Sequence, residues 1–143
     1  MDFHDETLQG NEIIEEAIRL YHQEPDNWRL MGVCMAVRKR IQEDGHLVFP
    51  ADISEDAEGN TTFAFKTLET DTGAVAIAAF TNPEKWKKGP PSGGVSQFID
   101  SVFEPLLQID SIDGVLLNPW GESIFLDKED ITVILNPGIE RFM

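Results

Sequence analysis

The stretch IDGVLLNPWGESIFL, residues 112–126, consists of two apolar runs joined by an Asn-Pro-Trp-Gly segment. Pro119 fixes φ for the second position of a tight turn, and Gly121 can adopt a positive φ just after it. These turn residues predict that the two runs pair as antiparallel strands.

A helix is expected directly after this hairpin. Asp127 and Asp130 have the spacing of a capping box, with Asp in place of the usual Glu or Gln. The helix that they start should bury the apolar residues that follow, Ile131, Ile134 and Leu135.

Two helices are predicted near the start of the chain, after an acidic lead over residues 1–9 that is expected to be frayed. Apolar residues at helical spacing indicate an amphipathic helix from Asn11, a candidate N-cap, to the stop at Pro25. The next helix, capped by Asp26 or Asn27 and closed at Asp44-Gly45, is apolar almost all round. It should therefore be central, with these apolar residues: Trp28, Met31, Val33, Cys34, Met35, Val37 and Ile41.

The middle of the chain alternates strands and loops. Strands are expected at residues 46–49, 61–67 and 75–80. Pro50 should end the first strand, and the continuous apolar run of the third is typical of the centre of a sheet. An acidic loop (51–60), a turn (68–72) and a Gly- and Pro-rich loop (82–94) separate them. Residues 95–109 have apolar residues at helical spacing, with Pro105 kinking or shortening the end.

The predicted order is α-α-β-β-β-α-β-β-α within one domain, residues 1–143. This order indicates an α+β (mixed α/β) fold, in which helices pack on a mixed sheet of about five strands.

The net charge of −15 comes from 26 acidic and 11 basic residues. Phosphate contacts need Lys and Arg, so the charge argues against nucleic acid or an anionic membrane as the partner. A basic protein partner would be attracted, although the acidity is also explained by solubility alone. The single cysteine and the absence of a long apolar segment predict a cytoplasmic protein without a disulfide.

Two segments carry a resemblance to a known family. The segments FAFKTLETDTGAVAIAAFTNPEKW (63–86) and IDGVLLNPWGESIFLDKE (112–129), with an amphipathic helix between them, resemble the N-terminal domain of the bacterial SseB family, the enhanced serine sensitivity proteins. The resemblance covers about residues 28–134. Its most specific pieces are Ala78 to Thr81 and Leu117 to Gly121. It implies an α/β fold with no assigned reaction and no agreed ligand.

Residues with reactive side chains give no catalytic pattern. Cys34 lies on an apolar helix, where a thiol is usually inert, and His4, His22 and His46 lack the spacing of metal ligands. The acidic loop lacks the ligand spacing of a calcium site, and the segment GPPSGGVS before a predicted helix lacks a nucleotide-binding signature, although its backbone could hold an anion. No catalytic residue, metal or cofactor is therefore assigned.

The candidate binding residues lie in two loops and at one strand end. Lys85, Lys87 and Lys88 surround Trp86, and Asn118, Pro119, Trp120 and Gly121 form the turn of the hairpin. Exposed tryptophans are common at binding hot spots, but Trp120 could equally fold back on the hairpin. Phe80 and Thr81 end the middle strand. If that strand is parallel to residues 115–118, the two strand ends meet on one rim of the sheet, where α/β folds tend to bind ligands.

These observations favour a non-catalytic protein-binding or regulatory module. The alternatives are an acidic immunity or antitoxin-like protein that neutralises a basic toxin, and a small-molecule sensor or enzyme that uses a pocket at the rim. Pairing of edge strands between chains would give a homo-oligomer.

Overall fold

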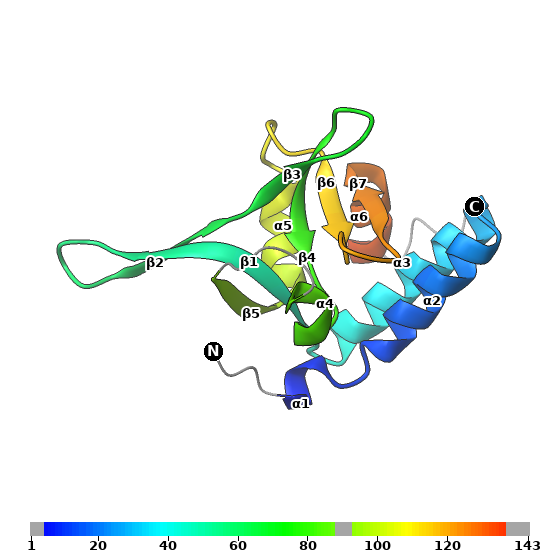
Figure 1. Cartoon of the computed structure of the whole chain (residues 1–143), viewed down its shortest axis with the longest axis horizontal. Helices are drawn as coiled ribbons and strands as arrows, with labels where there is room; N and C mark the ends of the chain where they lie inside the picture. Colours follow the sequence, from blue (N-terminus) through cyan, green and yellow to red (C-terminus); the bar gives the residue numbers. More distant parts are fainter. Residues whose placement is uncertain (1–4, 88–92, 137–143) are drawn as a thin grey trace.

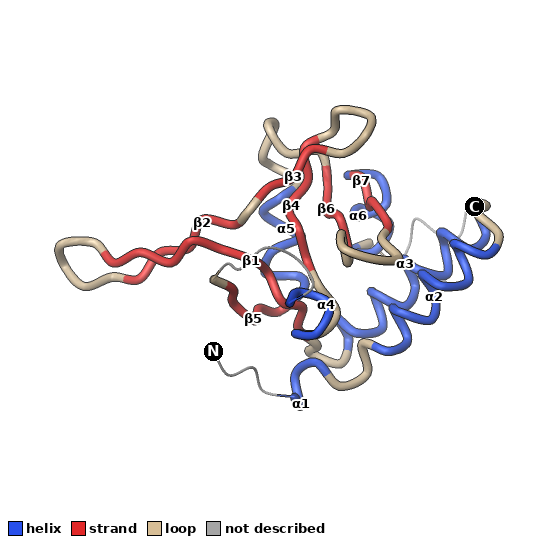
Figure 2. Tube along the Cα trace, in the orientation of Figure 1, coloured by secondary structure: helices blue, strands red, loops and turns tan. Residues whose placement is uncertain are grey.

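The computed structural model describes residues 5–87 and 93–136 and has a mixed α+β fold (Figures 1 and 2), as predicted. The helices are α1 (Asp5–Leu8), α2 (Glu12–Gln23), α3 (Asn27–Gln42), α4 (Pro83–Lys87), α5 (Ile99–Leu106) and α6 (Lys128–Leu135). The strands are β1 (His46–Glu55), β2 (Thr61–Phe65), β3 (Thr67–Glu69), β4 (Val75–Ala79), β5 (Gly94–Phe98), β6 (Gly114–Leu117) and β7 (Ile124–Asp127).

The strands form two sheets rather than the single sheet of about five strands that was expected. One has the order β2-β1-β5 and the other the order β3-β4-β6-β7. A bridge between Val48 and Phe80 joins them, with two backbone hydrogen bonds of 2.8 and 2.9 Å. Helices α2 and α3 lie side by side, and α3, α5 and α6 contact one another (Figure 1).

The hairpin of residues 112–126 forms as predicted. β6 and β7 are antiparallel, with Leu117 opposite Ile124. The capping box is also present, because Asp127 accepts from the backbone N–H of Asp130 at 2.8 Å and Asp130 accepts from that of Asp127 at 3.1 Å. The positive φ predicted for Gly121 falls instead on Asn118, at 51°.

β1 continues through Pro50, which was expected to end it. Residues 46–50 pair with β5, and residues 51–55 pair with β2 on the other side. Proline has no N–H to donate, so a position where the strand exchanges one partner for another tolerates it. The expected acidic loop is accordingly much shorter, and its first residues extend the β1–β2 hairpin that projects from the molecule (Figure 1).

The helix predicted over residues 95–109 divides into β5 and α5. Val95 lies at helical spacing from Ile99, but it pairs with Phe49 of β1. Long-range pairing with β1 therefore overrides the local periodicity. The strand expected over residues 61–67 ends at Phe65, and β3 (67–69) extends into the expected turn of 68–72. Residues 5–8, expected to be a frayed lead, form α1, and residues 83–87, expected to be a loop, form α4.

The core is formed mainly by α2, α3, α5, α6 and the strands β1, β4, β6 and β7. α3 contributes Val33, Cys34 and Val37, but it is less central than expected, because Trp28 is 82% exposed and Met35 is 54% exposed. In the described ranges, no helix combines the length and the apolar character that crossing a membrane requires.

Candidate functional site

The ends of β4 and β6 meet because these two strands are parallel, with Ala79 opposite Leu117. Just beyond them, the Thr81 backbone N–H donates to Asn118 Oδ1 at 3.0 Å, and Asn118 Nδ2 donates to Thr81 Oγ1 at 3.1 Å. Both residues are buried. We call this edge of the sheet, Thr81, Asn82 and Asn118, the rim.

Asn118 directs the chain away from β6. Its φ of 51° lies in the left-handed region, which Asn tolerates better than most residues. Its backbone N–H donates to Ala79 O at 2.8 Å, and its side chain is fixed by Thr81. The turn that begins at Asn118 is therefore anchored to β4.

Helix α2 is attached to the rim by two polar side chains. Glu15 accepts hydrogen bonds from Thr81 Oγ1 at 2.5 Å and from Asn82 Nδ2 at 2.6 Å. Asn11 donates to Thr81 O at 2.9 Å and to His46 O at 2.8 Å, and its Oδ1 accepts from Arg40 Nε at 2.8 Å. Asn11, a candidate N-cap from its position in the sequence, makes no side-chain capping bond and instead joins α2, α3 and both sheets.

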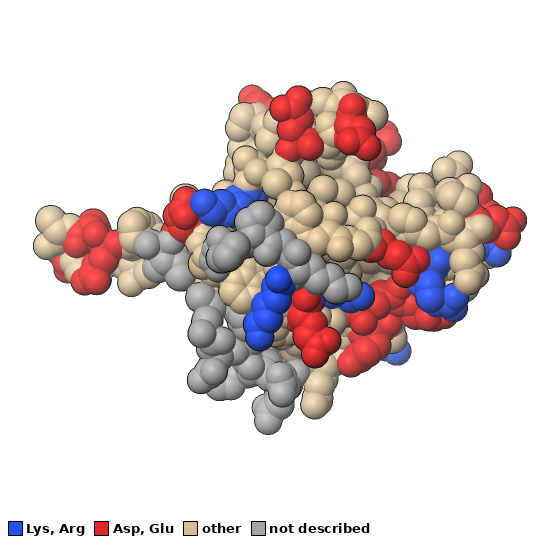
Figure 3. All heavy atoms as spheres, in the orientation of Figure 1, with Lys and Arg blue, Asp and Glu red and all other residues tan. Residues whose placement is uncertain are grey.

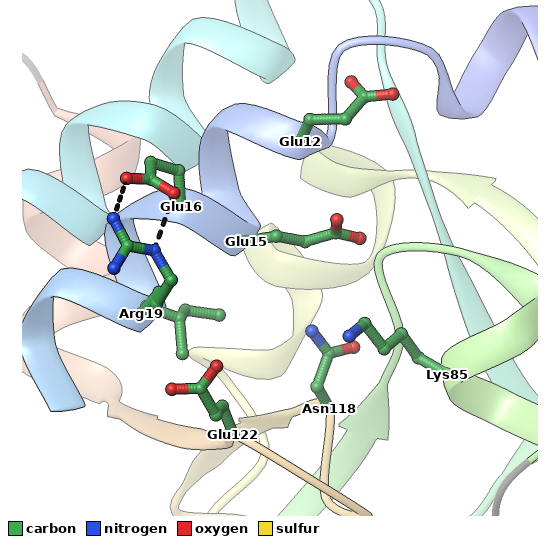
Figure 4. Close-up of a pocket in the computed structure, with 8 residues that line it drawn as sticks. Glu12, Glu15, Glu16, Arg19, Lys85, Asn118 and Glu122 are labelled. Atoms are coloured by element: carbon green, nitrogen blue, oxygen red, sulfur yellow. Dashed lines mark hydrogen bonds and ion pairs between the residues drawn. The ribbon is translucent and has the colours of Figure 1, made fainter.

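A pocket of ≈ 320 Å³ opens between α2, α4 and the rim (Figure 4). Glu15 and Lys85 reach into this space from α2 and α4, with Asn118 at its edge. Its lining residues are Glu12, Glu15, Glu16, Ile18, Arg19, Lys85, Asn118 and Glu122. We call it the rim pocket.

The rim pocket has an excess of negative charge. Four of its lining residues are glutamates, and two are cationic. Arg19 is paired with Glu16, to which its Nε donates at 2.9 Å. Lys85 forms no ion pair with any described residue. Its single positive charge is outnumbered by the three negative charges of Glu12, Glu15 and Glu122, which also line the pocket. The pocket therefore suits a cationic group more than an anionic one.

The turn residues lie beside this pocket. Asn118 and Glu122 both line it, and Pro119, Trp120 and Gly121 connect these two residues along the chain. Trp120 is 41% exposed, Pro119 is half-buried and Gly121 is exposed. Trp120 thus presents apolar surface to solvent next to an acidic pocket.

The second group of predicted binding residues is less accessible than expected. Trp86 lies in helix α4 rather than in a loop, is half-buried, and packs against the buried cluster that includes Val48 and Phe80. Phe80 itself is buried and cannot contact a partner directly. Lys87 is exposed. Lys88 lies outside the described residues.

Sequence reasoning missed the α2 side of the site. Glu12, Glu15 and Glu16 lie on the polar face of an amphipathic helix, a pattern that normally indicates solvent exposure. Glu15 reaches residues 66 and 67 positions later in the chain. No short-range pattern in the sequence could have indicated that contact.

Neither the single cysteine nor His46 lies at the rim. Cys34 is buried in the core, and burial raises the pKa of its thiol to about 12, so it stays protonated. His46 lies in β1, where burial and the nearby charge of Arg40 lower its pKa and favour the neutral ring. Its Nδ1 is 2.9 Å from Ser96 Oγ, and its ring packs against Phe98.

The acidic loop has a structural role. Asp56 accepts from the backbone N–H groups of Glu58 and Asn60, both at 2.9 Å, so it stabilises the β1–β2 turn. No cluster of three or more metal-binding side chains occurs within residues 5–87 and 93–136. Residues 89–92 of the segment GPPSGGVS lie outside these ranges, and its second half leads into β5, so a strand and not a helix follows it.

Searches of family models, of curated proteins and of solved structures found no match to this chain.

Proposed function

We propose that this chain is a non-catalytic, cytoplasmic binding or regulatory module of the SseB type that recognises a protein partner at the rim. The observation that carries the proposal is the position of Trp120, exposed in the turn whose neighbours Asn118 and Glu122 line an acidic pocket. An aromatic anchor next to a charged pocket is a frequent arrangement at interfaces.

The charge of the site favours a basic partner. Four glutamates and two cations line the rim pocket, and the whole chain carries −15. In the face seen in Figure 3, acidic atoms gather along α2 and at the tip of the β1–β2 hairpin. Long-range attraction would therefore steer a basic protein towards the surface that carries the pocket.

The size of the pocket indicates what part of the partner would enter it. Pockets for drug-sized ligands have volumes of about 300–1,000 Å³, and the rim pocket, at ≈ 320 Å³, is at the lower end of this range. A single Lys or Arg side chain fits this size and charge. Its methylene groups would contact Ile18, and its charged end would face the glutamates.

The chemistry of the pocket lining favours binding over nucleophilic catalysis. Its eight residues include no Cys, His, Ser or Thr, so they offer no hydroxyl or thiol nucleophile beside an imidazole base. The structural role of Glu15, which holds Thr81 and Asn82, also fits a fixed recognition surface.

A photo-cross-linking amino acid at position 120 tests the proposal in a bacterial host. We expect it to trap a discrete protein, whereas the same group at exposed Thr62 on β2 should not trap that protein. Glu122→Lys should abolish the cross-link from position 120. Glu104→Lys makes the same change of charge at an exposed site on α5 and should leave the cross-link intact.

Equal cross-linking in the two charge-reversal variants would contradict recognition at the rim pocket. The trapped protein should also bind the purified chain directly, more weakly as salt is raised. If the trapped protein is a basic toxin encoded by an adjacent gene, the immunity-type alternative replaces the regulatory one.

The volume of the rim pocket, ≈ 320 Å³, also favours a second candidate, a sensor of small organic cations. Thermal unfolding with arginine, lysine and a diamine tests it. A rise in melting temperature that is lost in Glu122→Gln and kept in Glu104→Gln would support the sensor. No shift with any of these compounds would count against it.

A further inference from the structure

Helix α3 has an outward face that no described part of the chain covers. It consists of Trp28, Gly32, Met35 and Lys39, which share one side of the helix because they are four, three and four residues apart. Trp28 is 82% exposed and Met35 is 54% exposed, while Gly32 and Lys39 are also exposed. We call these four residues the α3 face.

The other sides of α3 are occupied. Val33 and Val37 are buried in the core, and Arg38 Nε donates to Ile134 O of α6 at 3.1 Å. Arg40 binds Asn11 at the start of α2. The exposure of Trp28 and Met35 therefore does not result from a loosely packed helix.

The charge of α3 differs from that of the rest of the chain. α3 contains four basic residues and no acidic one, in a chain with a net charge of −15. Arg38 and Arg40 are buried, and Arg29 is paired with Glu24 and Asp26. Lys39, which makes no ion pair within the described residues, is the remaining cation and lies at one end of the α3 face.

The α3 face is complementary to itself. Two copies of α3 can pack antiparallel about a two-fold axis that crosses the α3 face halfway between Gly32 and Met35. Residues of the two copies then lie opposite each other when their numbers add up to 67. Trp28 then faces Lys39 of the second copy, a pairing of an indole ring with a cation. Gly32 faces Met35 of the second copy, so a long, flexible apolar side chain lies opposite a residue that has no side chain.

The space at Gly32 supports this pairing. A Cβ built there meets nothing within 4 Å, so the surface above Gly32 is open within its own chain. A Met side chain can adapt its shape to this open space because it is unbranched. A two-fold axis uses the same patch on both copies, so each complementary pair occurs twice.

We propose that the α3 face is a homodimer interface, in which two copies of this chain pack α3 against α3 in antiparallel orientation. The occupant is a second copy because the face supplies both members of each pair: an indole ring with a cation, and a long apolar side chain with a position that has no side chain. It is also a place where no acidic residue of α3 opposes the approach of two strongly acidic chains.

Sedimentation of the purified chain from micromolar to submillimolar concentration tests the proposal. We expect the mass to rise from 16.1 kDa to twice that value as the protein concentration is raised. The dimer should form at a lower protein concentration in high salt, because salt screens the repulsion between the two acidic chains. Met35→Glu and Gly32→Leu should each weaken the dimer at least tenfold. Phe98→Glu, a matched change at an exposed apolar residue of β5, should leave it unchanged.

The folding of each variant is checked by circular dichroism. If Gly32→Leu unfolds the chain, Lys39→Gln and Trp28→Ala provide the test at exposed positions, and both should weaken the dimer. A mass of 16.1 kDa at every concentration would overturn the proposal, and so would a dimer that none of these variants affects.

Cysteine cross-linking tests the orientation. In a Cys34→Ala background, a mixture of Gly32→Cys and Met35→Cys chains should form a mixed disulfide faster than either chain forms one with itself. A mixture of Met35→Cys and Gln42→Cys is the control and should cross-link slowly, because these positions do not face each other in the antiparallel arrangement. Faster cross-linking of Gly32→Cys with itself would indicate parallel helices and would overturn the proposal.

Discussion

Gly32 and Gly114 lie in regular elements but have very different surroundings. A Cβ at Gly32 meets nothing within 4 Å, whereas one at Gly114 would lie 2.1 Å from the backbone oxygen of Leu126. Glycine at position 32 therefore lowers the stability of α3 without a packing reason inside one chain, while glycine at position 114 is required by the close approach of β7.

We predict that Gly32→Ala raises the free energy of unfolding by about 0.5–1 kcal/mol, because it replaces a flexible residue inside a helix. Gly114→Ala should lower it by about 1–3 kcal/mol, through displacement of the backbone. Urea unfolding at low protein concentration measures both. Equal effects of the two changes would show that the surroundings given for these glycines are wrong.

Asn118 combines an uncommon backbone conformation with buried hydrogen bonds. Asn118→Gly keeps the positive φ but leaves the Thr81 N–H without its acceptor, at a cost of about 1–3 kcal/mol. Asn118→Ala should cost about 1 kcal/mol more, because alanine also disfavours φ near 51°. Thermal unfolding of the two variants separates these terms. If alanine were no worse than glycine, the left-handed conformation would contribute nothing measurable.

Among the elements, α6 depends on a capping box made of two carboxyl groups. Burial raises the pKa of Asp130 to about 6, and the nearby negative charge of Asp127 acts in the same direction. Because the pKa in the folded state exceeds the unfolded value near 3.8, the folded state holds the proton more tightly. The resulting stabilisation is present below about pH 4 and is lost as the pH rises through about 6.

We therefore predict that the difference in stability between the wild type and Asp130→Asn changes with pH. The wild type should lose about 1–2 kcal/mol relative to Asp130→Asn between pH 4 and pH 7, a value reduced from the full shift because Asp130 is partly exposed to solvent. Asn keeps an oxygen for the N–H of Asp127. Urea unfolding at a series of pH values measures the difference, and a constant difference would contradict the raised pKa.

At the scale of the whole molecule, Asn11 connects parts that are far apart in the sequence. Its side chain joins the start of α2 to Arg40 of α3, to His46 of β1 and to Thr81 after β4. These bonds lie in a buried region that links the helical pair to both sheets.

We predict that Asn11→Ala lowers the free energy of unfolding by about 2–4 kcal/mol, because it removes the donor to two backbone carbonyls and the acceptor of the buried Arg40 Nε–H. Asn60→Ala provides a matched loss of an asparagine in the exposed β1–β2 turn and should cost less than about 1 kcal/mol. Denaturant unfolding compares them. Similar small effects would mean that the Asn11 contacts do not join the parts of the fold.

The site is also a property of the whole molecule. The sequence offered Thr81, Asn118 and Trp120 as candidate binding residues, and it made the meeting of the two strand ends conditional on parallel strands, a condition that β4 and β6 satisfy. It did not identify Glu15 and Glu122, because charged residues on a polar helix face and in a turn normally indicate solvent. From the sequence, Trp28 was expected to lie in the core. A helix that is apolar almost all round does not show which of its sides is buried.

The sequence by itself determined the features that depend on neighbours a few residues apart. These are the antiparallel hairpin of β6 and β7, the capping box at Asp127 and Asp130, the amphipathic helix α2 and the mixed α+β class. Only the tertiary structure decided that Val95 belongs to a strand, that β1 passes through Pro50, that α2 closes the rim pocket and that Trp28 faces outward. Each of these features depends on backbone pairing or packing between segments that are distant in the sequence. The free energy of those contacts outweighs local conformational preference, and the spacing of neighbouring residues does not reveal them.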